Sequence, residues 1–194
     1  FANGRLELLR GYFEWKKRQL PHAMAYAKNH FGISGAAFTD YSSRRGEQPR
    51  GGHRYEKFVA DGPQIAQEFF KYWQYTQDDR FLKEEALPFL RETATFYLNY
   101  LEEGEDGKLH IRETLPYEFA GPYYFRDCIT DQAMLRWLLP SLIQAEKLSG
   151  AVSDLSRRAG EALARLAPIQ SGPIHENWLT EQNNRKIYAN PFFR

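Results

Sequence analysis

The feature that most constrains this chain is the spacing of its apolar residues, which recur at three- and four-residue steps over most of its length. That spacing places apolar side chains on one face of an α-helix, and it predicts six helical segments. They cover residues 5–20, 21–32, 63–76, 79–101, 130–150 and 153–167. Strict alternation, which is typical of strands, occurs only in residues 108–112, where Leu109 and Ile111 alternate with polar residues. The sequence therefore predicts an all-α domain whose helices pair as hairpins, with one short β segment.

Residues with strong effects on backbone geometry set the expected helix boundaries. Pro21 is expected to break the first helical stretch and to begin a second one, which stops at Gly32. Asp78 or Asp79 is expected to cap the helix predicted at residues 79–101. Pro88 is expected to kink or restart that helix. The intervening residues 33–61 and 113–129 lack a helical stripe, so both are expected to be long loops.

Charge and composition exclude several classes of protein. Lys and Arg total 26 against 25 Asp and Glu, a balance that argues against a nucleic acid or an anionic membrane as the main partner. No apolar run is long enough for a transmembrane helix. The single cysteine, Cys128, excludes an internal disulfide and is interpreted as a buried residue. The chain starts at Phe1, without an initiator Met or a signal peptide, so we expect a piece of a longer protein.

Common catalytic motifs do not occur in the chain. There is no phosphate-binding glycine loop, dinucleotide-binding fingerprint, HExxH pair or nucleophile-elbow serine. The histidines at 22, 30, 53, 110 and 175 show no ligand spacing and are interpreted as structural or surface residues. No organic cofactor and no metal is therefore expected. The basic stretch 44–54 is compatible with an anion site, but its glutamate and glycines favour a solvated loop.

The positive signal is Glu118, a carboxylate within a loop crowded by aromatic residues. Tyr117 and Phe119 flank it, and Tyr123, Tyr124 and Phe125 follow, in a chain that is 15% aromatic. Aromatic surroundings desolvate a carboxyl group and raise its pKa, as a general acid near neutral pH requires. Aromatic faces also stack on sugar rings, so the pattern is compatible with a sugar-binding cleft.

On the pattern alone, the competing interpretations stay open. An exposed loop glutamate is commoner than a catalytic one, and Glu118 fits that description as well. Asp127 and Asp131 follow closely and are suited to support Glu118, although Asp131 also fits the N-cap of the helix that begins there.

The chain resembles the six-hairpin glycoside hydrolases, whose catalytic domain is an (α/α)6 barrel, and within them the inverting α-L-fucosidases of glycoside hydrolase family 95. The resemblance extends from about residue 3 to residue 178, and its specificity lies in the order and spacing of its landmarks. These are Phe31-Gly32, Gly35-Ala36 and Thr39-Asp40; Tyr72-Trp73-Gln74-Tyr75-Thr76-Gln77-Asp78 with Phe81-Leu82; Pro88-Phe89-Leu90 with Phe96-Tyr97; Asp106-Gly107-Lys108-Leu109; Pro116-Tyr117-Glu118; Thr130-Asp131-Gln132; and Leu166-Ala167-Pro168 with Gly172.

The resemblance implies a role for Glu118. In the family a Ser-Pro-Glu segment supplies the general acid, and Glu118 is the residue that matches it, with Tyr117 in place of the family's proline. The family's paired asparagines would lie upstream of this chain and its aspartate base downstream. Residues 1–194 are then expected to form a single partial catalytic domain, about three helical hairpins of a partial (α/α)6 toroid that the rest of its own domain completes.

Further residues are expected to line the cleft. They are Asp40, His53, Trp73, Tyr117, Tyr123, Tyr124 and Asp127. The expected partner is a carbohydrate in an oligo- or polysaccharide, with an α-L-fucoside as one candidate. Two alternatives stay open: a six-hairpin disaccharide phosphorylase, and a non-catalytic carbohydrate-binding helical domain. The resemblance also favours an extracellular or periplasmic bacterial protein.

Overall fold

The computed structural model describes residues 4–40, 42–47, 56–115 and 124–169, and five long helices account for more than half of these described residues. They are α1 (Arg10–Tyr26), α2 (Asp61–Thr76), α4 (Leu87–Tyr100), α5 (Ile129–Ser149) and α6 (Asp154–Arg165). The all-α class is confirmed. None of these helices is both long and apolar enough to cross a membrane.

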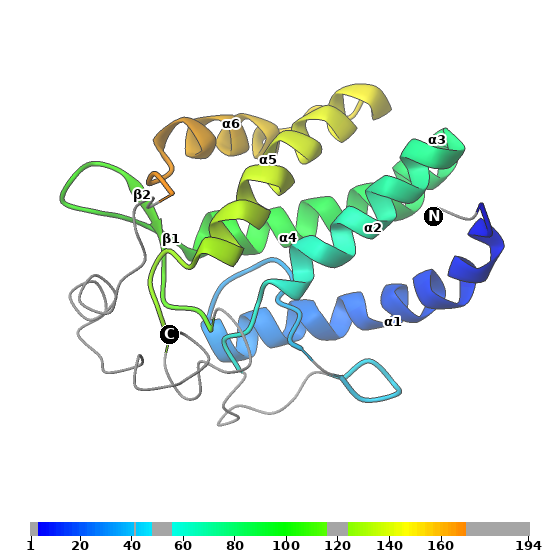
Figure 1. Cartoon of the computed structure of the whole chain (residues 1–194), viewed down its shortest axis with the longest axis horizontal. Helices are drawn as coiled ribbons and strands as arrows, with labels where there is room; N and C mark the ends of the chain where they lie inside the picture. The colour runs from blue at the N-terminus through cyan, green and yellow to red at the C-terminus, as the bar shows by residue number, and fades with distance from the viewer. Residues whose placement is uncertain (1–3, 41, 48–55, 116–123, 170–194) are drawn as a thin grey trace, which may run out of the picture.

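The helices stack in sequence order (Figure 1). Helix α2 packs against α4, α4 against α5, and α5 against α6, while α1 lies along the opposite side of the molecule from α6. A tight turn joins α2 to the short helix α3 (Asp79–Phe81) and α4, and a second turn at Gly150 joins α5 to α6. Two of the expected helical hairpins are therefore present side by side.

The first helix continues through Pro21, so the expected break at that residue is wrong. A proline inside a helix removes one backbone hydrogen bond, and here tertiary contacts offset the loss. Phe13 and Ala23, on either side of the proline, are both buried in the core. The helix ends through a π-turn (Ala27–Phe31) at Gly32, whose left-handed φ of 72° confirms the expected stop.

The start of α4 agrees with its sequence signals. The Asp78 side chain accepts hydrogen bonds from the backbone nitrogens of Arg80 and Phe81, which confirms it as the cap. A π-turn (Leu82–Ala86) then leads into α4, where Pro88 occupies the first turn and restarts the helix. Proline is tolerated there because a first-turn nitrogen has no intrahelical partner.

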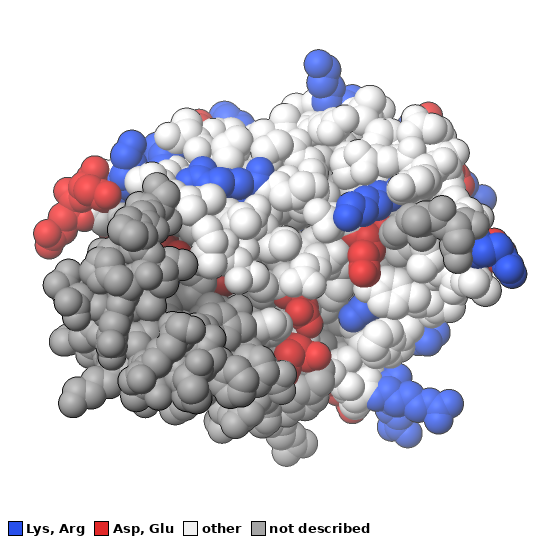
Figure 2. Space-filling view, in the orientation of Figure 1, with Lys and Arg blue, Asp and Glu red and all other residues white. Residues whose placement is uncertain are grey.

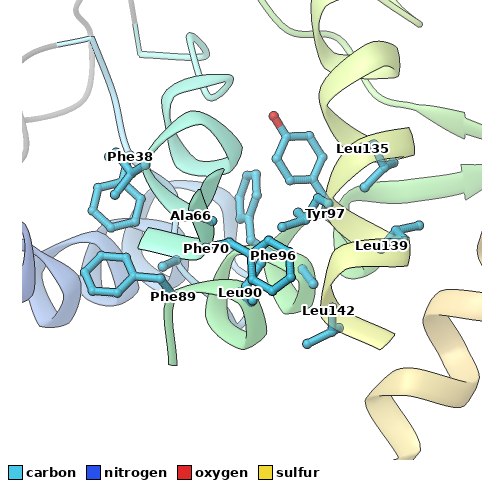
Figure 3. Packing of buried hydrophobic residues seen from close by; sticks show 14 of the residues in the cluster. Phe38, Ala66, Phe70, Phe89, Leu90, Phe96, Tyr97, Leu135, Leu139 and Leu142 are labelled. Atoms are coloured by element: carbon cyan, nitrogen blue, oxygen red, sulfur yellow. The ribbon is translucent and has the colours of Figure 1, made fainter. Parts of the chain in front are cut away.

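Aromatic rings form much of the core (Figure 3). The rings of Phe69 on α2 and Phe89 on α4 are stacked with their centroids 4.1 Å apart. Phe13 attaches α1 to the same cluster, because its ring lies 4.5 Å from that of Phe69. On the other side, Leu135 and Leu139 of α5 close over Tyr97 of α4.

Part of the first expected loop is buried. Residues 35–39 pass between α1 and α4, where Ala36 donates a backbone hydrogen bond to Glu92 and Ala37 donates one to Ala23. Gly35 has a φ of +101°, and a Cβ atom there would lie 2.1 Å from the Phe96 nitrogen. Only glycine allows this approach, so the segment belongs to the packed interior.

A two-stranded antiparallel hairpin follows α4. Its strands are β1 (Leu101–Glu103) and β2 (Leu109–Ile111), with Leu101 opposite Ile111 and Glu103 opposite Leu109. The extended piece at 108–112 is confirmed, whereas its partner strand was expected to be the end of a helix. Acidic side chains gather at the outer end of this hairpin, at the upper left of Figure 2.

Candidate functional site

The candidate site begins where the chain leaves β2 for residues 116–123 and returns from them. Thr114 and Phe125 pair in antiparallel fashion, with N–H to O=C distances of 2.9 and 2.8 Å. The nitrogen of Leu115 donates a further hydrogen bond, of 3.0 Å, to the carbonyl oxygen of Lys57. The two described ends of the segment that contains Glu118 therefore lie next to each other, on a fixed frame.

A buried carboxylate, that of Asp131, lies behind this pair. One oxygen accepts a hydrogen bond of 2.6 Å from the Tyr97 hydroxyl, and the other accepts one of 2.7 Å from the Thr114 hydroxyl. Burial raises the pKa of Asp131 to about 6, although the two hydrogen bonds favour the ionised form and limit the rise. The N-cap position of α5 belongs to Cys128, which makes no side-chain cap bond. The interpretation of Asp131 as an N-cap is therefore wrong.

Asp127 holds the returning end of the segment against β2. Its carboxylate accepts hydrogen bonds from the Ile111 nitrogen, at 2.8 Å, and from the Gln132 amide, at 3.1 Å. The second oxygen lies 2.5 Å from Nδ1 of His110, whose Nε2 lies 3.1 Å from the carboxylate of Asp106. These partners, the Asp127 bond first, raise the pKa of His110 despite its partial burial. Asp127 itself has a left-handed φ of 54°.

Tyr124 lies among charged and aromatic residues from the end of α1 and the approach to α2. The ammonium of Lys57 lies 4.7 Å from the centre of the Tyr124 ring, a cation–π distance. Burial, with the neighbouring Glu56 carboxylate, raises the pKa of the Tyr124 hydroxyl. Glu56 also lies 3.8 Å from His30, whose ring stacks on that of Tyr26. Tyr124 is thus part of a polar and aromatic cluster.

Cys128 lies between the two ends of the segment. Its sulfur is 3.1 Å from the carbonyl oxygen of Phe125 and 3.6 Å from that of Thr114. Burial raises the pKa of the thiol to about 12, so almost none of it is thiolate near neutral pH. The interpretation of Cys128 as a buried residue is confirmed.

The structure separates the other expected cleft residues. Asp40 is exposed, and its charge is one of those that raise the pKa of Asp61, behind the larger effect of burial. Trp73 is only 6% exposed and packs against Phe70 in the core, with ring centroids 5.1 Å apart. The remaining expected residues lie outside the described residues; they are Glu118, His53, Tyr117 and Tyr123.

Of the expected residues, the structure brings Tyr124 and Asp127 to the frame around Thr114. It adds two residues that the sequence did not single out for this site, the stacked His30 and the cation Lys57. The sequence suggests Asp131 as a support for Glu118, and the structure shows that its carboxylate makes two buried hydrogen bonds. The described residues contain no group of His, Cys, Asp and Glu side chains suited to hold a metal ion.

The stacked helical hairpins and the small β-hairpin, with carboxylates at their junction, fit part of an (α/α)6 domain of the six-hairpin type. Comparison with known families agrees, because the profile of the glycosyl hydrolase family 95 catalytic domain matches residues 6–188. The chain belongs to this family. No curated protein matches the chain. Family membership indicates a glycoside hydrolase, and its substrate class is carbohydrate.

Proposed function

We propose that the catalytic domain to which residues 1–194 contribute hydrolyses a glycosidic bond with inversion, and that Glu118 is its general acid. The observation that supports this most directly is the family match, which spans the segment of Glu118 and both of its described ends. Thr114 and Phe125 hold those ends together, so the segment starts and finishes on a rigid frame. Rigid support is what a catalytic group needs for a reproducible position.

The proposed reaction uses two carboxyl groups. A protonated Glu118 donates its proton to the leaving glycosidic oxygen, while a carboxylate outside this chain removes a proton from the attacking water. In inverting enzymes the two groups stand about 6.5–9.5 Å apart, which leaves room for that water. The bond from the anomeric carbon to the leaving oxygen breaks as the bond to water forms on the opposite face. The product is a sugar with inverted anomeric configuration.

The residues proposed to bind substrate are those expected from the sequence, Asp40, His53, Tyr117, Tyr123, Tyr124 and Asp127, while Trp73 is left out because its side chain packs in the core. Tyr124 has the most direct support among the described ones, because its ring and hydroxyl lie beside the frame that holds the Glu118 segment. An α-L-fucoside is the proposed substrate, in line with the family resemblance.

A substitution that keeps the shape of Glu118 tests the acid. In the full-length protein, Glu118→Gln should lower turnover of an alkyl fucoside, which has a poor leaving group, by roughly 10³-fold or more. An aryl fucoside with an activated leaving group needs less protonation, so its turnover should fall much less. Glu113→Gln is the matched control, because Glu113 is an exposed residue close by in the sequence and should tolerate the change. Wild-type turnover of the alkyl fucoside by Glu118→Gln would refute the assignment.

The stereochemistry of the product separates the proposal from its alternatives. Proton NMR during the first minutes of reaction should show the β-anomer of fucose before mutarotation. Cleavage that requires inorganic phosphate would instead indicate a disaccharide phosphorylase. Sugar binding by the full-length protein without any turnover would indicate a non-catalytic binding domain. Purified residues 1–194 should show no hydrolysis, because the proposed base lies outside them.

A further inference from the structure

The carboxylate of Asp131, in the first turn of α5, makes two hydrogen bonds to residues outside its own helix. It projects from α5 and is fully buried, and its two oxygens bind partners from two other parts of the fold. Tyr97 belongs to α4 and is 34 residues away in the sequence, while Thr114 lies 17 residues away, beyond β2. Both partners are themselves completely buried. One carboxylate therefore joins two helices to the point at which the chain leaves the β-hairpin.

The bond to Thr114 matters because Thr114 has two further roles. Its nitrogen and its carbonyl oxygen both pair with Phe125, so Thr114 fixes the returning strand as well as the departing one. Glu118 is four residues beyond it, which corresponds to at most about 14 Å of fully extended chain. A shift of Thr114 would therefore be transmitted to both ends of the segment that contains the proposed acid.

We propose that Asp131 is a positioning residue, which acts through the Thr114 hydroxyl to fix the frame from which Glu118 reaches the leaving oxygen. This inference rests on the proposed function of Glu118. The carboxylate of Asp131 is fully buried, which closes it to a substrate, and the Tyr97 hydroxyl from α4 holds its other oxygen. A hydroxyl-to-carboxylate bond in a dry interior has a narrow range of favourable geometry, which suits it to this task.

The test uses the full-length protein and removes the Thr114 hydroxyl without changing the size of the side chain. Thr114→Val should lower kcat for the alkyl fucoside by roughly 10- to 100-fold, the loss that a small misplacement of a catalytic group produces. The KM should change less than about twofold, since the substrate-binding groups are untouched. Thr114→Ser keeps the hydroxyl and should retain most of the activity.

Comparing substrates with different leaving groups distinguishes a positioning role from a purely structural one, which would slow both substrates equally. If Thr114 acts through the acid, Thr114→Val should slow the alkyl fucoside much more than the activated aryl fucoside. Asp131→Asn should show the same selectivity, and the double variant should be no slower than the slower single variant, because both changes break one link. Equal losses on the two substrates would overturn the inference, since they would indicate general damage to the fold.

Thr93→Val is the matched control. Thr93 lies on α4, is fully buried, and its hydroxyl has no hydrogen-bond partner among the described residues. The same substitution there should leave kcat for both substrates unchanged.

The outcome for Glu118→Gln separates the two proposals. If Glu118→Gln keeps its activity on the alkyl fucoside, the proposed function fails and this inference fails with it. If Glu118→Gln is inactive but Thr114→Val is fully active, only the positioning role is refuted.

Discussion

The guanidinium of Arg91 on α4 donates a hydrogen bond of 2.7 Å to the carboxylate of Glu146 on α5. The same guanidinium donates one of 2.8 Å to the carbonyl oxygen of Ala151, in the turn before α6. Ser153 and Ser156 donate to Glu146 as well, from the start of α6. Burial opposes the ionisation of Glu146, but these bonds outweigh it and lower its pKa. One buried carboxylate thus joins three helices.

Removing the cation from this site should destabilise the fold. Arg91→Ala leaves Glu146 charged and buried with only the serine bonds, so we expect a loss of about 2–4 kcal/mol in the free energy of unfolding. Urea denaturation followed by circular dichroism measures it. Arg80→Ala is the control, because Arg80 forms an exposed pair with Glu84 on one helix turn. Exposed pairs contribute little, so that variant should lose no more than about 0.5 kcal/mol. Equal losses would contradict this account.

A methyl group at Gly35 should be tolerated very poorly. It would meet the backbone of Phe96 at 2.1 Å, and the φ of +101° is unfavourable for any other residue. We expect Gly35→Ala to lower the free energy of unfolding by at least about 3 kcal/mol or to prevent folding. Gly107 provides the comparison: its φ is +72°, but nothing lies within 4 Å of the added carbon. Gly107→Ala should therefore cost only about 1 kcal/mol, and thermal melting of both variants distinguishes the two cases.

The buried Asp131 should make stability depend on pH. Its pKa rises from 3.8 to about 6 on folding, so the folded state binds the proton more tightly than the unfolded state. Its contribution to stability is therefore complete below pH 3.8 and is lost as the pH rises through 6, by about 3 kcal/mol in all. Unfolding free energies measured between pH 4 and 7 should show this decline in the wild type. Asp131→Asn should show a smaller decline, because Asp61, whose pKa burial also raises to about 6, titrates in the same range. The same slope in both proteins would show that Asp131 is not the group responsible.

Truncating the aromatic core should be costly. Phe69 is completely buried, and its ring packs between those of Phe13 and Phe89. We expect Phe69→Ala to lose about 3–5 kcal/mol, from lost burial and from the cavity that remains. Tyr75 lies on the same helix but is 61% exposed, so Tyr75→Ala should change stability by less than about 1 kcal/mol. Chemical denaturation of the pair provides the measurement.

Local signals predicted most of the helices. Gly32 and Gly150 end their helices with left-handed φ values of 72° and 71°, and Asp78 and Ser153 cap theirs with side-chain hydrogen bonds. Such features depend on neighbours a few residues apart, so sequence reveals them. Pro21 was different, because the packing of its own helix outweighed the one bond that the proline removes.

Contacts between distant parts of the chain were the features that sequence could not reveal. The glycine-rich start of the first loop is buried because Gly35 meets α4, some 60 residues further along. The role of Asp131 depends in the same way on Tyr97 and Thr114. By residue type alone, Gly35 is compatible with an exposed loop and Asp131 with a helix cap. Only their three-dimensional contacts show that both are buried. Where Glu118 lies relative to a substrate stays a prediction.

The pairing of Thr114 with Phe125 has a consequence for how proteins of this kind diversify. Because the two backbones are joined at the base of the intervening segment, residues can be added to or removed from that segment without moving the helices beneath it. New sugar specificities could then arise through changes in the length and composition of this segment, while selection for stable folding acts on the helices. Apart from the proposed acid Glu118, changes of residue type between Thr114 and Phe125 should therefore alter the free energy of unfolding little.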